Sequence, residues 1–187
     1  MLFPVIIGGS AGSYKILIKL LAALPVNFHF PIIICVHRPK VSDHSFITAL
    51  ENRSKAEIKE ITQHEPIKSG IVYLTPSDVH LEFKDKNTFY LSKEMPVKHS
   101  RPSIDHCLKS AANTFKTKLI AIILTGANSD GAEGMKSVHN AGAITIVQTP
   151  SDAEIPIMPK SALNTFLPSY VLKAEEIINF IKKLATN

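Results

Sequence analysis

The stretch PVIIGGSAGS, residues 4–13, sets the architecture of this chain. Apolar residues run into a glycine-flanked serine, and an amphipathic pattern with helical spacing starts directly after it. This order predicts a strand, a sharp turn and a helix. Gly8, Ser10 and Gly12 match the G-x-S-x-G pattern, which exposes a reactive serine at such a turn. The alternative is a tight structural turn that contains a serine, and this stretch alone favours neither.

Further apolar runs repeat the alternation of strand and helix. Residues 31–36 and 119–124 are continuous apolar runs, which are typical of strands buried on both faces of a parallel sheet. Residues 143–147 form a shorter run of the same kind. Amphipathic helical patterns stand between these runs and near the C-terminal end. The chain is therefore predicted to be an α/β fold with a doubly wound, mostly parallel sheet and flanking helices.

The middle of the chain departs from this alternation. Two short apolar segments, 79–83 and 88–91, flank the sequence KDKN, which is a hairpin signal. We expect an antiparallel hairpin excursion near 79–92, off the main sheet or at its edge. Residues 149–161 are rich in proline and acidic groups and predict a loop. Without internal repeats or low-complexity linkers, residues 1–187 are interpreted as a single domain.

Composition argues against several classes of function. The 187 residues are 45% hydrophobic and 20% charged, which is ordinary for a globular protein. A net charge of +5 with scattered basic residues gives little support to nucleic-acid binding. No apolar stretch approaches the roughly 20 residues that cross a bilayer, so membrane insertion is not expected. Two cysteines without a C-x-x-C spacing predict buried, reduced thiols in the cytoplasm.

Polar side chains stand where three of the predicted strands end. Ser10 follows the first strand, His37 follows the second, and Asp130 follows the strand at 119–124. Ligands bind outside the carboxyl ends of the strands in such a sheet. A hydroxyl, an imidazole and a carboxylate at one edge are the parts of an activated serine nucleophile. The sequence thus predicts a Ser10–His37–Asp130 triad that needs no cofactor.

Each member of this triad has a structural alternative. Ser10 is a candidate to cap the following helix, although Ser13 lies closer to the helical pattern and is the better candidate for the cap. His37 is one of eight histidines and fits an exposed strand end. Asp130 and Glu133 have the spacing of a capping box, in which the carboxylate accepts amides of its own helix. Taken together, three complementary groups at three strand ends favour chemistry.

Other polar groups give weaker signals. Residues 8–13 lack both the glycine spacing of a dinucleotide-binding loop and the lysine-serine pair of a Walker motif. Four polar residues gather at a predicted helix start: His99, Arg101, Asp105 and His106. They either contact substrate, with Arg101 as the candidate, or form a solvated helix end. His64 and His80 are interpreted as surface positions. No group of His, Cys or Asp has metal-ligand spacing, so no metal is expected.

Six segments of the chain stand in a specific order. They are residues 7–12 (IGGSAG), 36–39 (VHRP), 70–76 (GIVYLTP), 99–105 (HSRPSID), 123–126 (ILTG) leading to 129–135 (SDGAEGM), and 158–162 (MPKSA). In this ordered combination, over nearly the whole length, the chain resembles the catalytic domain of the chemotaxis receptor methylesterases, the CheB family.

The resemblance implies an activity and its residues. The family hydrolyses glutamate methyl esters on the cytoplasmic helices of chemoreceptors, releases methanol, and deamidates certain receptor glutamines. Its nucleophile, base and orienting acid fall on Ser10, His37 and Asp130. Backbone amides near Ala11 or Ala127 are expected to hold the oxyanion. Methylated chemoreceptors in the cytoplasm are the implied partners.

The chain departs from the family pattern at four positions: Ala11, Ser13, Ala127 and Asn128. The family has threonine after the nucleophile, a Gly-Gly where this chain has Gly12-Ser13, and Gly-Met-Gly over residues 126–128. These changes leave open a related serine esterase with another substrate, or an interaction domain weakened in catalysis. The family's usual N-terminal receiver domain is absent from these residues, so we expect either a separate receiver protein or constitutive activity.

Overall fold

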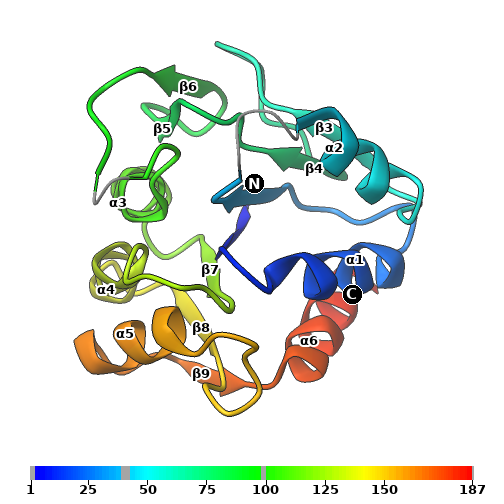
Figure 1. Ribbon diagram of the computed structural model, residues 1–187. Coiled ribbons are helices and arrows are strands. Elements are labelled where there is room, and N and C mark those ends of the chain that lie inside the picture. The colour runs from blue at the N-terminus through cyan, green and yellow to red at the C-terminus, as the bar shows by residue number, and fades with distance from the viewer. Residues whose placement is uncertain (1–2, 39–42, 98–99, 187) are drawn as a thin grey trace.

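The computed structural model describes residues 3–38, 43–97 and 100–186. Its centre is a seven-stranded sheet in the order β3-β4-β2-β1-β7-β8-β9 (Figure 1). All neighbouring strands in this sheet pair in parallel. The strands are β1 (Val5–Gly9), β2 (Ile32–Val36), β3 (Glu57–Glu60), β4 (Ile71–Leu74), β7 (Ile120–Ile123), β8 (Ile144–Gln148) and β9 (Tyr170–Leu172). The predicted parallel α/β sheet is therefore confirmed.

Helices cover both faces of the sheet. They are α1 (Ser13–Ala23), α2 (Asp43–Glu51), α3 (Ile104–Phe115), α4 (Ala132–Asn140), α5 (Ile157–Thr165) and α6 (Ala174–Thr186). Figure 1 shows α3, α4 and α5 on one face and α1, α2 and α6 on the other. Within the described residues, no helix has the length and apolar character required to cross a bilayer.

Alternating strand residues build two separate cores. Ile6 and Ile33 belong to the core beneath α3, α4 and α5, while Val5 and Ile7 belong to the core beneath α1 and α6. The inner strands are apolar at nearly every position because both faces are covered. Cys35 and Cys107 are buried free thiols, as the sequence predicted.

Gly8 fixes how closely α3 approaches the central strand. A Cβ atom at this position would lie 2.6 Å from Cγ2 of Ile104 and 2.8 Å from Cδ1 of Ile123. Only a residue without a side chain allows Ile104, at the start of α3, to pack directly on β1. This contact brings the N-terminus of α3 to the carboxyl end of the sheet, where the candidate site lies.

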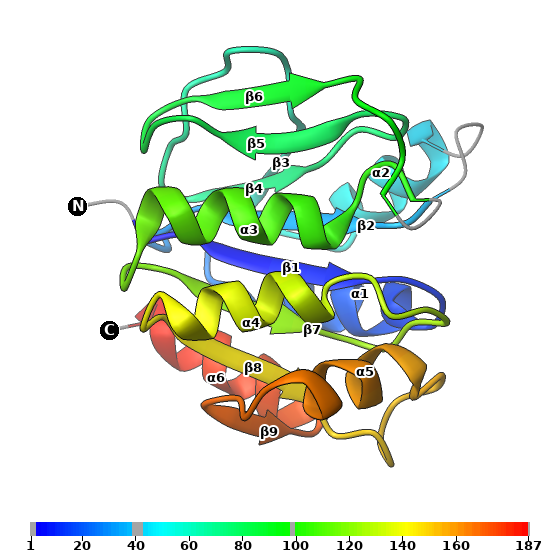
Figure 2. The ribbon, with the colours of Figure 1, turned by 90° about the vertical axis from the view of Figure 1, so that its left-hand side faces the viewer.

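The predicted hairpin is confirmed. Strands β5 (His80–Phe83) and β6 (Phe89–Ser92) form a separate antiparallel pair, which stands beside α3 in Figure 2. Hydroxyls on α3 join the two elements, since Ser110 Oγ and Thr114 Oγ1 both donate to the carbonyl of Phe83.

Two elements near the C-terminal end differ from the sequence prediction. The loop predicted over 149–161 ends early, because α5 begins at Ile157. Pro156 is its N-cap and Pro159 lies in its first turn, where proline is tolerated since the amides there have no intrahelical acceptor. Strand β9 was not predicted, because its apolar run is only three residues long and mostly exposed.

Candidate active site

Ser10 lies directly after β1, in the turn that leads to α1. Its backbone amide donates to the carbonyl of Thr125, 3.0 Å away. Its side chain is half-buried, and no described residue forms a hydrogen bond with its hydroxyl. The hydroxyl is therefore free for chemistry, as a nucleophile requires.

The turn around Ser10 is built by glycine and by a second serine. Gly12 is the N-cap of α1 with a φ of 84°, a left-handed conformation that favours glycine. Ser13 does not cap the helix, so that prediction was wrong. Its hydroxyl instead donates to the carbonyl of Ser10 at 2.6 Å, which ties the turn to the first turn of the helix.

His37 follows β2 and lies beside Ser10. Its amide donates to the carbonyl of Gly9 at 3.3 Å, so the parallel register of β1 and β2 places these two residues next to each other. The imidazole Nε2 lies 2.8 Å from Oδ2 of Asp130, and the side chain is 17% exposed. The structure therefore joins His37 to Asp130 across 93 positions of sequence.

Asp130 is fully buried and accepts hydrogen bonds from the start of α3. Its carboxylate accepts from Ser103 Oγ at 2.9 Å, from the amide of Ile104 at 2.7 Å and from the amide of Asp105 at 3.0 Å. With the bond from His37, four donors converge on one carboxylate. The positive end of the α3 dipole adds to this stabilisation of the anion.

The capping-box interpretation of Asp130 was wrong. The N-cap of α4 is Gly131, without a side-chain hydrogen bond. Asp130 instead serves the neighbouring helix α3, and Asp105 of α3 accepts the amide of Gly134 in α4 at 2.8 Å. The carboxylate just before α4 therefore binds the start of α3, and a carboxylate in the first turn of α3 binds α4. These contacts hold Asp130 in place against His37.

The Asp130 carboxylate is ionised in the folded protein. Burial raises the pKa of this carboxyl, but the hydrogen bond from His37 and those from the amides of Asp105 and Ile104 outweigh it, so the pKa lies below its ordinary value of 3.8. A carboxylate anion accepts only, so His37 Nε2 carries the proton of this bond. The lone pair of neutral His37 is therefore on Nδ1.

The free energy of unfolding should depend on pH through the ionisation of Asp130. Because the folded pKa is depressed, the contribution of Asp130 to the free energy of unfolding is complete above the ordinary pKa of 3.8 and is lost as the pH falls through the folded pKa. We expect Asp130→Asn to be less stable than wild type at pH 7 and to lose less stability below pH 4. Denaturant unfolding from about pH 7 down to about pH 2 measures both slopes. Equal slopes in the two proteins would contradict the depressed pKa.

Comparisons with known proteins identify the family of this chain. Residues 5–181 match the family model described as CheB methylesterase. The chain belongs to the CheB methylesterase family. A solved CheB methylesterase catalytic domain from Thermotoga maritima superposes with a TM-score of 0.93 at 33% identity, over 98% of this chain and 99% of that one.

Curated relatives of this CheB family member differ in length. A protein of Leptospira interrogans serovar copenhageni, named a putative protein-glutamate methylesterase/protein-glutamine glutaminase, is 40% identical over 183 residues, which are 98% of this chain and 95% of the relative. A protein of Thermotoga maritima, named protein-glutamate methylesterase/protein-glutamine glutaminase, is 35% identical over 92% of this chain and 51% of its own length. The chain thus spans nearly all of the first relative and about half of the second.

Two free amides lie near Ser10 in this CheB domain. The structure gives the amides of Ala11 and Ala127 no acceptor among the described residues, and both residues are exposed. They lie one position after Ser10 and two positions after Thr125, the residue whose carbonyl accepts the amide of Ser10. Unpaired amides beside a nucleophile can bind a developing oxyanion.

Arg101 lines a polar pocket of about 190 Å³ with His37, Arg38 and Ser100. Its guanidinium donates to Asp78 Oδ1 through Nε and Nη2, at 2.9 and 2.5 Å. The second arginine, Arg38, is 3% exposed and forms an ion pair with Glu60. The structure therefore brings Arg101 from the predicted polar cluster to the side of His37, with both guanidiniums held by carboxylates.

The rest of the polar cluster at the start of α3 has other partners. Asp105 is buried, so this helix end is not solvated. His106 lies 3.2 Å from Glu82 Oε1 and stacks on His80. His80 is fully buried, so its interpretation as a surface position was wrong, whereas His64 is exposed. His99 lies outside the described residues.

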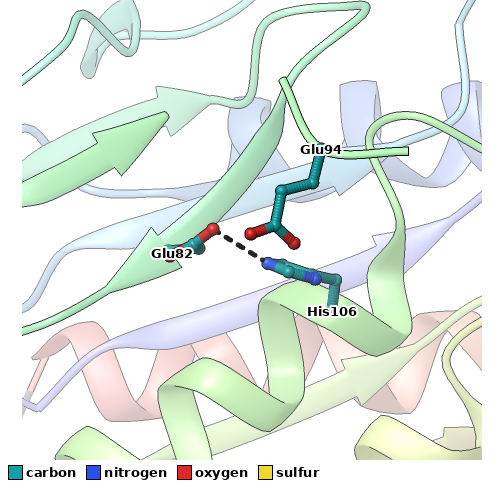
Figure 3. A group of neighbouring side chains, drawn as sticks. All are labelled: Glu82, Glu94 and His106. Carbon is teal, nitrogen blue, oxygen red and sulfur yellow. Dashed lines mark hydrogen bonds and ion pairs between the residues drawn. The ribbon is translucent and has the colours of Figure 1, made fainter. Parts of the chain in front are cut away.

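One group in the described part of the chain could hold a metal ion: Glu82, Glu94 and His106, with ligand atoms within 4.8 Å of one another (Figure 3). Three separate elements supply these residues, so no spacing in the sequence reveals them. Glu94 is exposed, and Glu82 already accepts a hydrogen bond from His106. We interpret the group as a hydrogen-bonded His106–Glu82 pair beside an exposed carboxylate, and the absence of a metal stays a prediction.

Asn128 is a residue of this site that sequence reasoning did not assign a role. Its Oδ1 accepts the amide of Asp130 at 3.0 Å, and its Nδ2 lies 3.4 Å from Nδ1 of His37. The sequence signal was its departure from the family pattern, at a position where the family has glycine.

Proposed function

We propose that this chain hydrolyses glutamate methyl esters on the cytoplasmic helices of chemoreceptors, releasing methanol, with Ser10, His37 and Asp130 as its catalytic triad. Deamidation of receptor glutamines is a second reaction of the same site. The observation that carries the proposal is the 2.8 Å bond between His37 and the buried Asp130 at the strand end beside Ser10. Membership of the CheB methylesterase family supports the choice of substrate.

The first half of the reaction forms an acyl-enzyme. Ser10 Oγ attacks the ester carbonyl of the receptor glutamate while His37 Nδ1 takes its proton. Asp130 stabilises the imidazolium through Nε2, where the hydrogen bond is charge-assisted. The amides of Ala11 and Ala127 donate to the oxyanion. His37 then returns the proton to the leaving methoxide, which departs as methanol.

The second half regenerates the enzyme. A water molecule gives a proton to His37 Nδ1 and attacks the acyl carbon. The bond between this carbon and Ser10 Oγ then breaks, His37 returns the proton to Oγ, and the receptor glutamate leaves as a carboxylic acid that ionises. An amide substrate follows the same course with ammonia as the leaving group. Arg38 and Arg101, which pair with Glu60 and Asp78, line the neighbouring pocket. We assign Arg101 to contacts with polar or acidic receptor side chains around the ester.

Methanol release from methylated chemoreceptor membranes tests this function. Wild type should release methanol with a kcat/KM at least about 100-fold above that for N-acetylglutamate γ-methyl ester, because only the receptor offers binding energy away from the ester. Equal kcat/KM for the two substrates would point to a related serine esterase. Methanol release from neither substrate by a folded protein would point to the interaction domain.

Partners beyond the receptor are part of the proposal. We propose a separate receiver protein as a further partner, with activity that needs no receiver as the alternative. The cytoplasmic location expected from the sequence follows from the receptor helices that the enzyme is proposed to serve. Addition of a phosphorylated receiver protein to the methanol assay distinguishes the two modes of control.

A further inference from the structure

His37 offers one nitrogen for proton transfer, and the structure identifies it. Nε2 donates to the ionised Asp130 at 2.8 Å, so the lone pair that must take the Ser10 proton is on Nδ1. No described residue forms a hydrogen bond with the Ser10 hydroxyl. The nitrogen that acts as the base is therefore not engaged by the nucleophile in this structure.

A different side chain faces this lone pair. Asn128 Oδ1 accepts the amide of Asp130 at 3.0 Å, which fixes the orientation of the side-chain amide because an NH₂ group cannot accept that bond. The NH₂ group of Asn128 then points at Nδ1 of His37, 3.4 Å away. Asn128 thus places a donor where the hydroxyl of Ser10 must donate.

We propose that Asn128 restrains the triad: its amide occupies Nδ1 of His37 in the resting enzyme and must release this nitrogen before Ser10 can react. The inference rests on the proposed role of Ser10 and His37. Asn128 is a positioning residue that acts through His37 and touches no reacting atom of the substrate.

Protonation of His37 at Nδ1 makes its contact with Asn128 unfavourable. When the Ser10 O–H bond breaks, its proton forms an N–H bond at Nδ1, and the electron pair stays on Oγ to form the new bond to carbon. An N–H group at Nδ1 then faces the N–H groups of Asn128, so a weak attraction becomes a repulsion. The restraint therefore raises the barrier to attack. At 3.4 Å the contact is long, so its removal should accelerate attack by roughly two- to tenfold, the range of one neutral hydrogen bond.

Two substitutions separate restraint from structural support. Asn128→Ala removes both contacts, whereas Asn128→Asp keeps the acceptor for the amide of Asp130 and removes the donor toward His37. The readout is the second-order rate constant for labelling of Ser10 by a fluorophosphonate probe, which needs no receptor. We expect Asn128→Ala to react faster than wild type, and Asn128→Asp to react more slowly at neutral pH, because a carboxylate beside Nδ1 stabilises the protonated imidazole, which cannot accept the Ser10 proton.

A purely structural role predicts the opposite order. Asn128→Asp would then react like wild type and Asn128→Ala more slowly, and that order would overturn the proposal. Ser129→Ala is the matched control, because Ser129 is exposed in the same loop, and its labelling rate should equal that of wild type. Thermal unfolding of each variant checks that the fold is kept.

A second measurement stands independently of catalysis. The ¹⁵N resonance of His37 Nδ1 reports whether a donor occupies its lone pair. We expect this resonance to move downfield in Asn128→Ala, toward the position of a free lone pair, and an unchanged resonance would overturn the proposal. If Ser10 failed to label in every variant, the proposed function would fall, while the resonance would still decide whether Asn128 holds Nδ1.

Discussion

Replacing Ser10 with alanine should reduce methanol release from methylated receptors by at least about 10⁴-fold, and should abolish fluorophosphonate labelling. The nucleophile is lost, and the other serine of this turn, Ser13, cannot replace it, because its hydroxyl donates to the carbonyl of Ser10. Stability should hardly change, since the Ser10 hydroxyl is half-buried and bonds to no described residue. Melting temperatures of the two proteins check this second expectation.

Ser13→Ala is the matched control for this experiment. It removes a buried hydroxyl three residues away and leaves Ser10 in place. Loss of its hydrogen bond to the Ser10 carbonyl should cost about 1 kcal/mol of stability and leave labelling of Ser10 intact. Methanol release that survives Ser10→Ala would exclude Ser10 as the nucleophile and the triad with it.

Replacing Asp130 with asparagine should lower kcat by about 10⁴-fold, because His37 loses the anion that fixes its tautomer and stabilises its cation. This substitution should also destabilise the fold by about 2–4 kcal/mol. Both carboxylate oxygens of Asp130 accept hydrogen bonds from buried donors. An asparagine NH₂ group replaces one oxygen and leaves donors facing donors in a site that water does not reach.

Asp105→Asn separates the two effects of that substitution. Asp105 is also buried and accepts the amide of Gly134 across the same pair of helices, whereas Nε2 of His37 bonds to Asp130. It should lose stability without a comparable loss of kcat at a temperature where both variants are folded. Full activity in folded Asp130→Asn would assign Asp130 to helix packing alone.

The sequence predicted the site through the ends of its strands. Ser10 and His37 follow two apolar runs that are long enough to form strands, and Asp130 lies in the loop after a third. The carboxyl ends of parallel strands share one edge of the sheet. The same patterns predicted the hairpin near 79–92. These features depend on local composition and period, which a single chain displays directly.

Other parts of the site depend on contacts between distant segments. The carboxylate of Asp130 has the spacing of a cap for its own helix, yet it accepts amides of α3, because Gly8 allows Ile104 to pack closely on β1. The amide of Asn128 faces His37 for a similar reason, since a loop after β7 meets the end of β2. Spacing along the chain contains no information about either meeting.

The sequence by itself determined the parallel sheet, the hairpin and the three residues at the strand ends, because hydrophobic period and strand termination are local properties. Only the tertiary structure decided which helix Asp130 stabilises, which nitrogen of His37 carries the lone pair and which side chain faces it. Those choices come from the packing of α3 and α4 over the sheet, where buried donors must find acceptors and the nearest acceptor belongs to a different part of the chain.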